Sequence, residues 1–341
     1  MKKIRLAGIL ILAVFLAAVT TNCGGGGSGN SQSQGGIPPG PSDALWAKFP
    51  ADFSALDVVT VADGVIISGN DNTAFVVKYS FSGSQQWLVR MSASTFKNGL
   101  VVNGEKVIVA TTEPVIFYTL SSVNGSVLSR DEVGWSAFFG KAIACDNSGG
   151  YVVGIPQLVA SSDAIYRVGD LLSLNGIDCV VKNTRAIAVK DGYLYILGDA
   201  YTNRFMYAVA LGQGPGFEFS FFNGTSARAS VFDSNWIYVV AIWNGKYVVM
   251  SFPQVTADQF LWPPRFAQLP MTGTPYGIAV YDNATIMLCG DAPQSEVLMN
   301  GVTYRVYPGS GVALSPDKQY LFLANGNGIY RFEARTGNPA R

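Results

Sequence analysis

The sequence predicts an all-β fold, a seven-bladed β-propeller of four-stranded antiparallel blades in residues 44–341. Three observations support this: a short apolar strand ending in Gly or Ala recurs seven times, turn signals separate the strands, and no segment has a helical period. The recurring strands end at Gly69, Ala110, Gly154, Gly198, Ala241, Gly290 and Ala324. Their six intervals cover 255 residues, or 42.5 per repeat, which is typical of a propeller blade.

Each recurring strand follows another short apolar strand across a hairpin turn such as Asp63-Gly64 or Asn103-Gly104. The preceding strands begin at Val59, Gly99, Ala142, Ala186, Ala229, Gly277 and Gly311. Six of the seven therefore begin with Gly or Ala, and small residues are expected where strands crowd around a common axis. We expect these strands to line the centre of the ring.

Two outer strands are expected to complete each blade. In the first repeat they cover residues 74–80 and 86–91, on either side of the turn Ser82-Gly83. In the sixth repeat, Asn300-Gly301 marks the corresponding hairpin. Two inner and two outer strands, all antiparallel, account for the length of each repeat.

The last repeat lacks an outer strand of its own, because the chain ends soon after residues 328–338. Residues 44–49 resemble the outer strand 86–90 of the first repeat. An N-terminal strand that pairs into the last blade would close the ring and remove an open sheet edge. Residues 44–341 then divide as 298 over seven, or about 42.6 per blade, which supports seven blades.

Residues 1–22 are typical of an export signal. Lys2, Lys3 and Arg5 form a basic start, and Leu6 to Val19 is a run of 14 apolar and small residues. This run is shorter than the roughly 20 residues of a spanning helix, although a membrane anchor is the alternative interpretation. Residues 24–43 are rich in Gly, Ser, Gln and Pro, which predicts a flexible tether.

Cys23 lies directly between the apolar run and the Gly-rich tract, and this arrangement resembles a bacterial lipoprotein signal. The resemblance implies that residues 1–22 are removed, that Cys23 is acylated, and that residues 23–43 form the lipid-anchored tether. Ordinary signal-peptidase cleavage is the alternative. An exported protein anchored to the cell envelope is expected, and Gly24 after the cysteine favours the outer membrane.

A short motif relates the repeats to known propellers. Glu333 to Gly337 followed by the wrapped Trp46, and Ser82-Gly83 followed by Trp87, resemble the D-x-x-T-G-x-x-x-W element of PQQ-like and YVTN-like propeller repeats. The resemblance implies the repeat class. This architecture is also used by PQQ-like dehydrogenases, lactonases and lyases, so a propeller enzyme remains an alternative function.

The composition bears on function. The chain has no His, the commonest general base and a frequent metal ligand, and its 23 Lys and Arg balance 23 Asp and Glu. Without residues 1–22 the net charge becomes −3, which disfavours a nucleic-acid partner. No CxxC pair, calcium loop or phosphate-binding loop occurs, so we expect no metal and no cofactor. Cys145 and Cys179 are candidates for a disulfide, and the alternative is that Cys145 and Cys289, which both lie in apolar strand-like runs, act as small hydrophobic residues.

Three cations mark a candidate ligand site. Lys141, Arg185 and Arg228 precede the innermost strands of three consecutive blades, where an arc of positive charge would bind a carboxylate, a phosphate or an acidic peptide. The alternative is that they pair with acids of adjoining loops. Those acids are Asp71, Glu113, Asp199 and Asp291.

Trp262, Arg265 and Phe266 form a candidate partner-binding segment in the longest repeat. Pro263 and Pro264 cannot donate ladder hydrogen bonds, so this stretch is predicted to be an exposed loop. Trp, Arg and Phe are common at protein interfaces. The alternative is that the segment covers the bottom of the propeller.

Together these features predict a monomeric, non-catalytic cell-envelope lipoprotein whose propeller binds an envelope protein or serves as an interaction scaffold. The membrane would be contacted through the N-terminal lipid. The alternatives are a propeller enzyme or a binder of a small anionic ligand or glycan at the channel mouth.

Overall fold

The structure of the chain is a computed structural model that divides it into two compact units, residues 1–35 and 36–341. All described residues belong to the second unit. The described ranges are 42–50, 52–92, 95–111, 116–132, 143–146, 149–154, 164–167, 177–178, 182–190, 192–199, 204–210, 217–220, 225–233, 236–253 and 265–340. The predicted signal, Cys23 and tether therefore lie outside the described residues.

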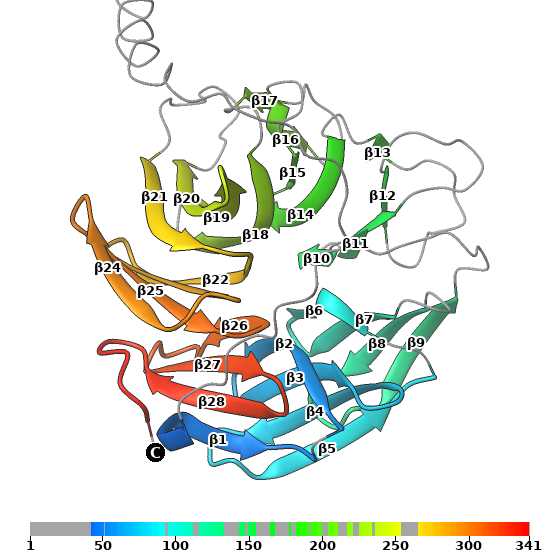
Figure 1. Ribbon diagram of the computed structural model, residues 1–341. Helices are drawn as coiled ribbons and strands as arrows, with labels where there is room; N and C mark the ends of the chain where they lie inside the picture. Colours follow the sequence, from blue (N-terminus) through cyan, green and yellow to red (C-terminus); the bar gives the residue numbers. More distant parts are fainter. Residues whose placement is uncertain are drawn as a thin grey trace, which may run out of the picture. The chain divides into compact units, whose positions relative to one another are not determined.

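Seven blades of four strands follow one another along the chain, and the fourth and fifth blades are joined into one eight-stranded sheet by the pair Asp199 and Ser226 (Figure 1). The first three blades are β2 (Ser54–Val61), β3 (Gly64–Asn70), β4 (Ala74–Ser80) and β5 (Gln85–Arg90); β6 (Thr95–Asn103), β7 (Lys106–Thr111), β8 (Ile116–Ser121) and β9 (Val127–Glu132); and β10 (Ile143–Asp146), β11 (Gly149–Gly154), β12 (Ala164–Arg167) and β13 (Ile177–Asp178). The next two are β14 (Lys182–Lys190), β15 (Tyr193–Asp199), β16 (Arg204–Ala210) and β17 (Phe217–Ser220); and β18 (Ser226–Asp233), β19 (Trp236–Trp243), β20 (Lys246–Pro253) and β21 (Arg265–Thr272). The last two are β22 (Pro275–Asp282), β23 (Thr285–Gly290), β24 (Ser295–Met299) and β25 (Val302–Pro308); and β26 (Gly311–Leu314), β27 (Tyr320–Asn325), β28 (Gly328–Glu333) and β1 (Leu45–Lys48).

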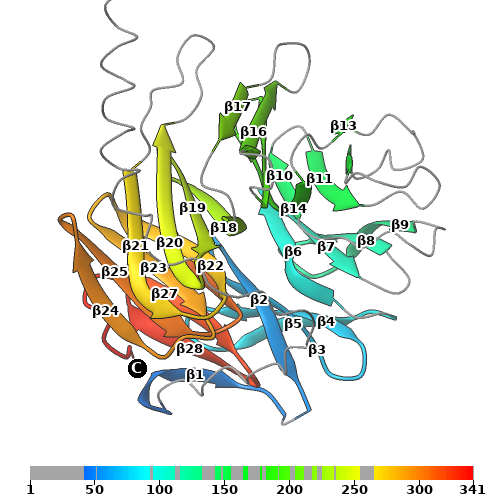
Figure 2. The ribbon, with the colours of Figure 1, turned by 45° about the horizontal axis from the view of Figure 1, so that its top comes forward.

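The seven blades form a closed ring. Each innermost strand, from β2 to β26, contacts the innermost strands of the blades before and after it, and β26 contacts β2. The predicted closing strand is confirmed: β1 pairs antiparallel with β28, and the two lie side by side in both views (Figure 1, Figure 2). The ring of Trp46 on β1 packs edge-on against Phe322 at a centroid distance of 5.0 Å. The seven-bladed propeller predicted from the repeat is therefore observed.

Blade six departs from the predicted antiparallel pattern. Its fourth strand in sequence, β25, pairs parallel with β23, and β24 becomes the outer edge. Tyr304 and Val306 on β25 are buried, whereas Leu298 on β24 is 74% exposed. The more apolar strand thus takes the inner place, because that arrangement removes more apolar surface from water. Asn300 and Gly301, with φ of 54° and 77°, form the tight turn between the two strands.

The hydrophobic core lies between neighbouring blades. One cluster joins blades one and two around Ile66, Trp87 and Val109, and another joins blades five and six around Tyr247 and Leu288. The described residues contain one helical segment, the 3₁₀ turn Ser42–Ala44, and none of their helices is long and apolar enough to cross a membrane. The apolar contacts between neighbouring blades therefore stabilise the ring.

Candidate functional site: the central channel

A β-bulge shapes the innermost strand of several blades. The register of these strands shifts near their N-terminal ends, and the first residue after the shift is Asp57 on β2, Ala186 on β14, Ala229 on β18 and Gly277 on β22. Bulges often aim a particular side chain at a functional surface. All four residues line a central cavity of about 180 Å³. The corresponding residue of blade two is Leu100, so Asp57 occupies a position where four other blades have Ala, Gly or Leu.

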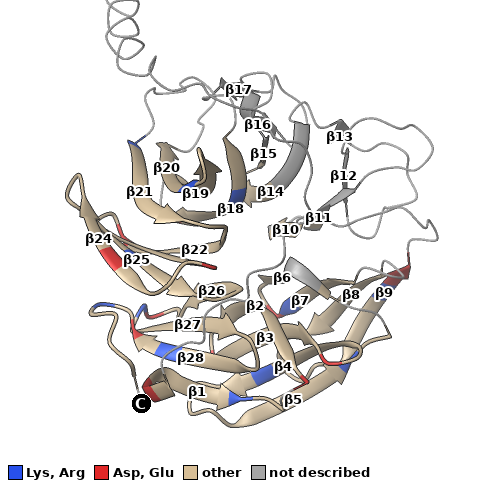
Figure 3. Cartoon of the chain, viewed as in Figure 1, with Lys and Arg blue, Asp and Glu red and all other residues tan. Residues whose placement is uncertain are grey.

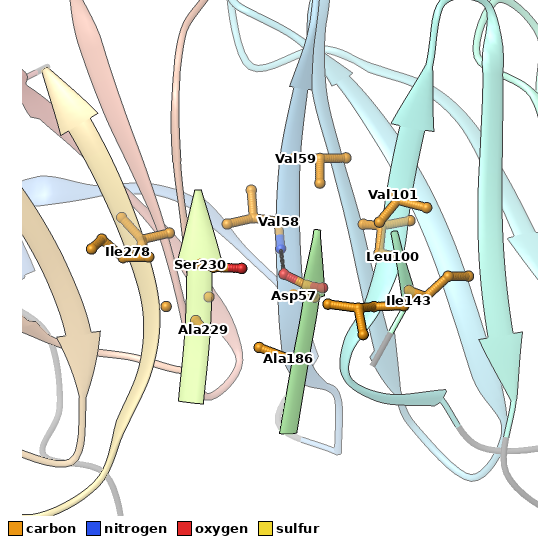
Figure 4. A pocket seen from close by; sticks show the side chains of 14 residues that line it. Asp57, Val58, Val59, Leu100, Val101, Ile143, Ala186, Ala229, Ser230 and Ile278 are labelled. Atoms are coloured by element: carbon orange, nitrogen blue, oxygen red, sulfur yellow. Dashed lines mark hydrogen bonds between the residues drawn. The ribbon is translucent and has the colours of Figure 1, made fainter. Parts of the chain in front are cut away.

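The wall of this cavity is almost wholly aliphatic. All seven innermost strands contribute to it, and Figure 4 shows its lining from close by. The larger apolar side chains are Val58, Val59, Leu100, Val101, Ile143, Ile187, Ile278 and Val312. Asp57 and Ser230 have the only polar side chains among the lining residues, and both point into the cavity (Figure 4).

Asp57 is held close against its neighbours. Its Oδ1 accepts the backbone N–H of Val58 at 2.9 Å, and a Cβ added to Gly311 of the last blade would lie 2.9 Å from the Asp57 Cα. Burial raises the pKa of Asp57 to about 7, although the backbone N–H groups of Val58 and Leu100 favour the ionised form. A carboxyl with this pKa changes its charge near neutral pH.

Ser230 approaches the same cavity from blade five. Its hydroxyl oxygen is buried and has no hydrogen-bond partner within the described part of the chain. A buried hydroxyl without a partner is unfavourable, because it has lost its bonds to water. Asp57 and Ser230 thus offer two polar groups on an otherwise apolar wall.

A wider space of about 570 Å³ lies at the C-terminal ends of the innermost strands. The two spaces share wall residues such as Val58, Ser230 and Ile278, so they lie next to each other along the channel. Lys318 at the wider mouth lies 3.4 Å from the Asp233 carboxylate and donates to Tyr281 O at 2.7 Å. This contact links blades seven, six and five at the rim.

The three predicted cations are placed unequally. Lys141 lies outside the described residues, and of Arg185 only the backbone in β14 is described. Arg228 is the single Lys or Arg of β18 and is visible as its blue band (Figure 3). It is half-buried and lies near blade six, where its charge opposes the increase in the pKa of Tyr276 that burial and Asp291 cause. The cavity wall includes Ala229 and Ser230 but not Arg228.

Two of the acids proposed as partners for these cations have other contacts. Asp71 forms an ion pair with Arg90 in its own blade, which corrects the expectation that it faces an innermost-strand cation. That ion pair lowers the pKa of Asp71 against the opposing effect of burial. Asp291 accepts hydrogen bonds from the Thr274 N–H and the Tyr247 hydroxyl. Glu113 and the Asp199 side chain lie outside the described part.

Arg265 and Phe266, two of the three predicted partner-binding residues, border a second cavity, of about 320 Å³, between blades five and six. Trp262 lies outside the described residues. Arg265 is exposed, and its guanidinium lies 4.7 Å from the ring centroid of Trp236. Phe266 is half-buried and packs edge-on against Trp243 at 6.0 Å, so this residue contributes to the core. The cavity is lined by Arg265, Phe266, Tyr238, Asn283, Asn300 and Tyr304, among others.

The cysteines have different environments. Cys145 donates its thiol to Val102 O at 3.3 Å, and Cys289 is buried in the core. Cys179, the predicted disulfide partner of Cys145, lies outside the described residues. Within the described ranges, no group of three or more Cys, Asp or Glu residues is placed to hold a metal ion.

The sequence interpretation missed Asp57, because it started the innermost strand of blade one at Val59. The strand begins at Ser54 and its bulge precedes Asp57. The distance in sequence to the end of the next strand could have identified Asp57. Asp57 precedes the strand-ending Gly69 by 12 residues, and Ala186 likewise precedes Gly198 by 12. Alignment from the strand ends would have placed Asp57 among the small residues of the ring.

Comparison with known proteins supports the architecture. No family model and no curated protein match the sequence. A chain of Kuenenia stuttgartiensis hydrazine synthase is similar, with a TM-score of 0.60 and 14% identity over 89% of this chain and 99% of that chain. A chain of the mitotic checkpoint complex has a TM-score of 0.51 and 9% identity over 85% and 80%. At these identities the likeness shows the fold, a β-propeller, and nothing about activity.

Proposed function

We propose that the protein is an exported, lipid-anchored β-propeller that binds an envelope protein without catalysing a reaction. The export signal and the cysteine that precedes a flexible tether support the location. The first described residues form the 3₁₀ turn Ser42–Ala44 and the outer strand β1. The strand β1, which follows the proposed tether in sequence, pairs with the outer side of the last blade and not with the strands that line the channel.

The observation that carries the binding role is the surface between blades five and six. Arg265 stacks on Trp236, and the Tyr238 hydroxyl donates to Asn283 Oδ1 at 2.9 Å on the other side of the same cavity. A guanidinium, aromatic rings and amides beside a hollow are typical of interface hot spots. The predicted loop that contains Trp262 comes shortly before Arg265 in the sequence.

Site-specific photocrosslinking of the full-length protein in its native membrane tests this proposal. A photoreactive amino acid at Arg265 should form a stoichiometric adduct with one envelope protein. The same group at Gln86, an exposed position on blade one, is the matched control and should give no such adduct. Deletion of Trp262 to Phe266 should abolish recovery of that partner after crosslinking.

A negative result would have a clear meaning. Equal adducts from both positions would indicate contact with abundant neighbours, and the absence of an adduct from Arg265 would overturn the proposed surface. Recovery of the same partner by the deletion variant would place the interface on another blade.

A further inference from the structure

The carboxyl of Asp57 accepts the backbone N–H groups of Val58 and Leu100, yet it stands at a position where other blades carry no polar side chain. At the matching position, blades four, five and six have Ala186, Ala229 and Gly277, and blade two has Leu100, so none of these four blades places a polar side chain there. Asp57 is 9% exposed and is the only ionisable residue among the 14 that line the cavity. Buried carboxylates are costly unless a cation or several hydrogen bonds compensate. Positions that break a local rule in this way are typical of functional sites.

The surroundings of Asp57 restrict what can bind there. A carboxylate attracts a cation with N–H donors, and charge-assisted hydrogen bonds of this kind are strong. The aliphatic wall favours an apolar body on that cation. Ca²⁺ takes six to eight oxygen ligands, far more than the two polar side chains of this wall supply. A cavity of about 180 Å³ exceeds the roughly 150 Å³ that accommodates a benzene molecule in a protein interior.

We propose that the central channel binds a small primary alkylammonium ion, with Asp57 as its counter-ion and the Ser230 hydroxyl as a second polar contact. The ammonium group donates to the Asp57 carboxylate and to the Ser230 oxygen, which both point into the cavity (Figure 4). The alkyl group packs against side chains such as Val58, Ile187 and Ile278. Binding removes the cost of two polar groups that burial leaves poorly satisfied.

The wider space lies next to the inner cavity along the channel and shares wall residues with it, so we expect the ligand to enter from that side. The ammonium of Lys318 at the rim is already paired with Asp233 and Tyr281 O, which reduces its repulsion of an incoming cation. This site is separate from the surface around Arg265, so a negative result for one proposal does not contradict the other.

Calorimetric titration of the full-length, detergent-extracted protein with n-butylammonium at pH 8 tests the proposal. The unmodified protein should bind one equivalent, and n-butanol, which has the same alkyl chain without the charge, should not bind measurably. Asp57→Asn should weaken binding at least about tenfold, because a charged hydrogen bond is lost. Ser230→Ala should weaken it about fivefold, as expected for one neutral hydrogen bond.

Asp282→Asn is the matched control, because Asp282 lies on an exposed turn of blade six and its loss should leave binding unchanged. Absence of butylammonium binding to the unmodified protein would overturn the proposal. So would equal affinity of the Asp57→Asn variant, or equal binding of n-butanol. The Ser230→Ala variant keeps the test decisive if Asp57→Asn fails to fold.

Discussion

The indole ring of Trp87 on β5 lies directly against Gly125 in the turn between β8 and β9 of the next blade. A Cβ at Gly125 would lie 2.9 Å from Trp87 Cδ2, and the Trp87 indole also donates to Ser122 O at 3.3 Å. Trp46 has a related position beside Gly83, where the corresponding Cβ would lie 3.6 Å from its Nε1. The Trp of each T-G-x-x-x-W element therefore packs against a turn glycine of the next blade.

The junction between blades six and seven uses a different residue for the same purpose. Gly337 faces Arg305 of β25, whose Cδ would lie 3.0 Å from an added Cβ. The Arg305 guanidinium donates to Ala334 O and Arg335 O, and its Nε donates to Glu296. The parallel placement of β25 thus brings an arginine to a position that tryptophan occupies in blade one. Hydrogen bonds replace ring packing at this junction.

Gly125→Ala should destabilise the protein by about 1–3 kcal/mol, because Gly125 has a φ of 73° and its Cβ would collide with Trp87. Gly104→Ala is the matched control: its φ is 57°, but a Cβ there meets no atom within 4 Å. The control should lose only the cost of the left-handed backbone, about 1 kcal/mol. Urea unfolding of both variants measures the difference, and equal losses would show that the ring contact contributes nothing.

Lys78→Met tests a second contact between blades one and two. The ammonium of Lys78 is buried, lies 2.7 Å from Asp63 Oδ1, and donates to Ser122 O at 2.9 Å. Methionine keeps the apolar stem but removes both polar contacts, so we expect a loss of about 1–3 kcal/mol. Asp63 is largely exposed and becomes hydrated, which limits the loss.

Lys106→Met provides the comparison for Lys78, because Lys106 is an exposed lysine at the start of β7. Its replacement should change the free energy of unfolding by less than about 0.5 kcal/mol. Chemical denaturation at neutral pH gives both values. A loss at Lys78 no greater than the loss at Lys106 would contradict a stabilising role for the buried ammonium.

The repeat made the fold predictable. Strand-ending Gly and Ala residues at nearly constant intervals require one repeated unit, and the resemblance of residues 44–49 to 86–90 located the closing strand. These signals are local, so a single sequence contains them. The place of a strand within its sheet depends instead on competition between strands for burial, and this competition gave β25 the inner position in blade six.

The candidate site was harder to predict, for a related reason. A β-bulge adds a residue to one strand, and that shift changes which side chains face the channel. Asp57 follows such a bulge, so its direction depends on hydrogen-bond register as well as on composition. The sequence shows the cations at the strand starts directly, whereas one carboxyl and one hydroxyl on different blades face the same cavity only when the ring closes.

Cys23→Ser should abolish lipid attachment if the lipoprotein-like signal is used. Only the Cys23 thiol follows the apolar run directly, so its loss removes the predicted acylation site. Metabolic labelling with a radioactive fatty acid should label the unmodified protein and the Cys145→Ser control, but not Cys23→Ser. Label retained by Cys23→Ser, or absent from the unmodified protein, would contradict the proposed anchor.

Asp57→Asn should change how stability depends on pH. Burial raises the pKa of Asp57 from 3.8 to about 7, so between these values the folded state retains a proton that the unfolded state has released. Stability from this group is complete below about pH 4 and is lost as the pH rises through 7. Because one pKa unit corresponds to about 1.4 kcal/mol, the loss above pH 7 reaches at most about 4 kcal/mol.

Asparagine does not titrate, so the variant should match the unmodified protein near pH 4 and exceed its stability at pH 8. Urea unfolding of both proteins at several pH values, in a buffer without amines, measures the difference directly. The difference should grow between pH 4 and 7 and then remain constant, because the folded carboxyl is ionised above that range. A variant that is less stable than the unmodified protein at pH 8 would mean that the protein itself already stabilises the Asp57 carboxylate, through a cation or through the backbone N–H groups of Val58 and Leu100, and would contradict a free counter-ion for an ammonium ligand.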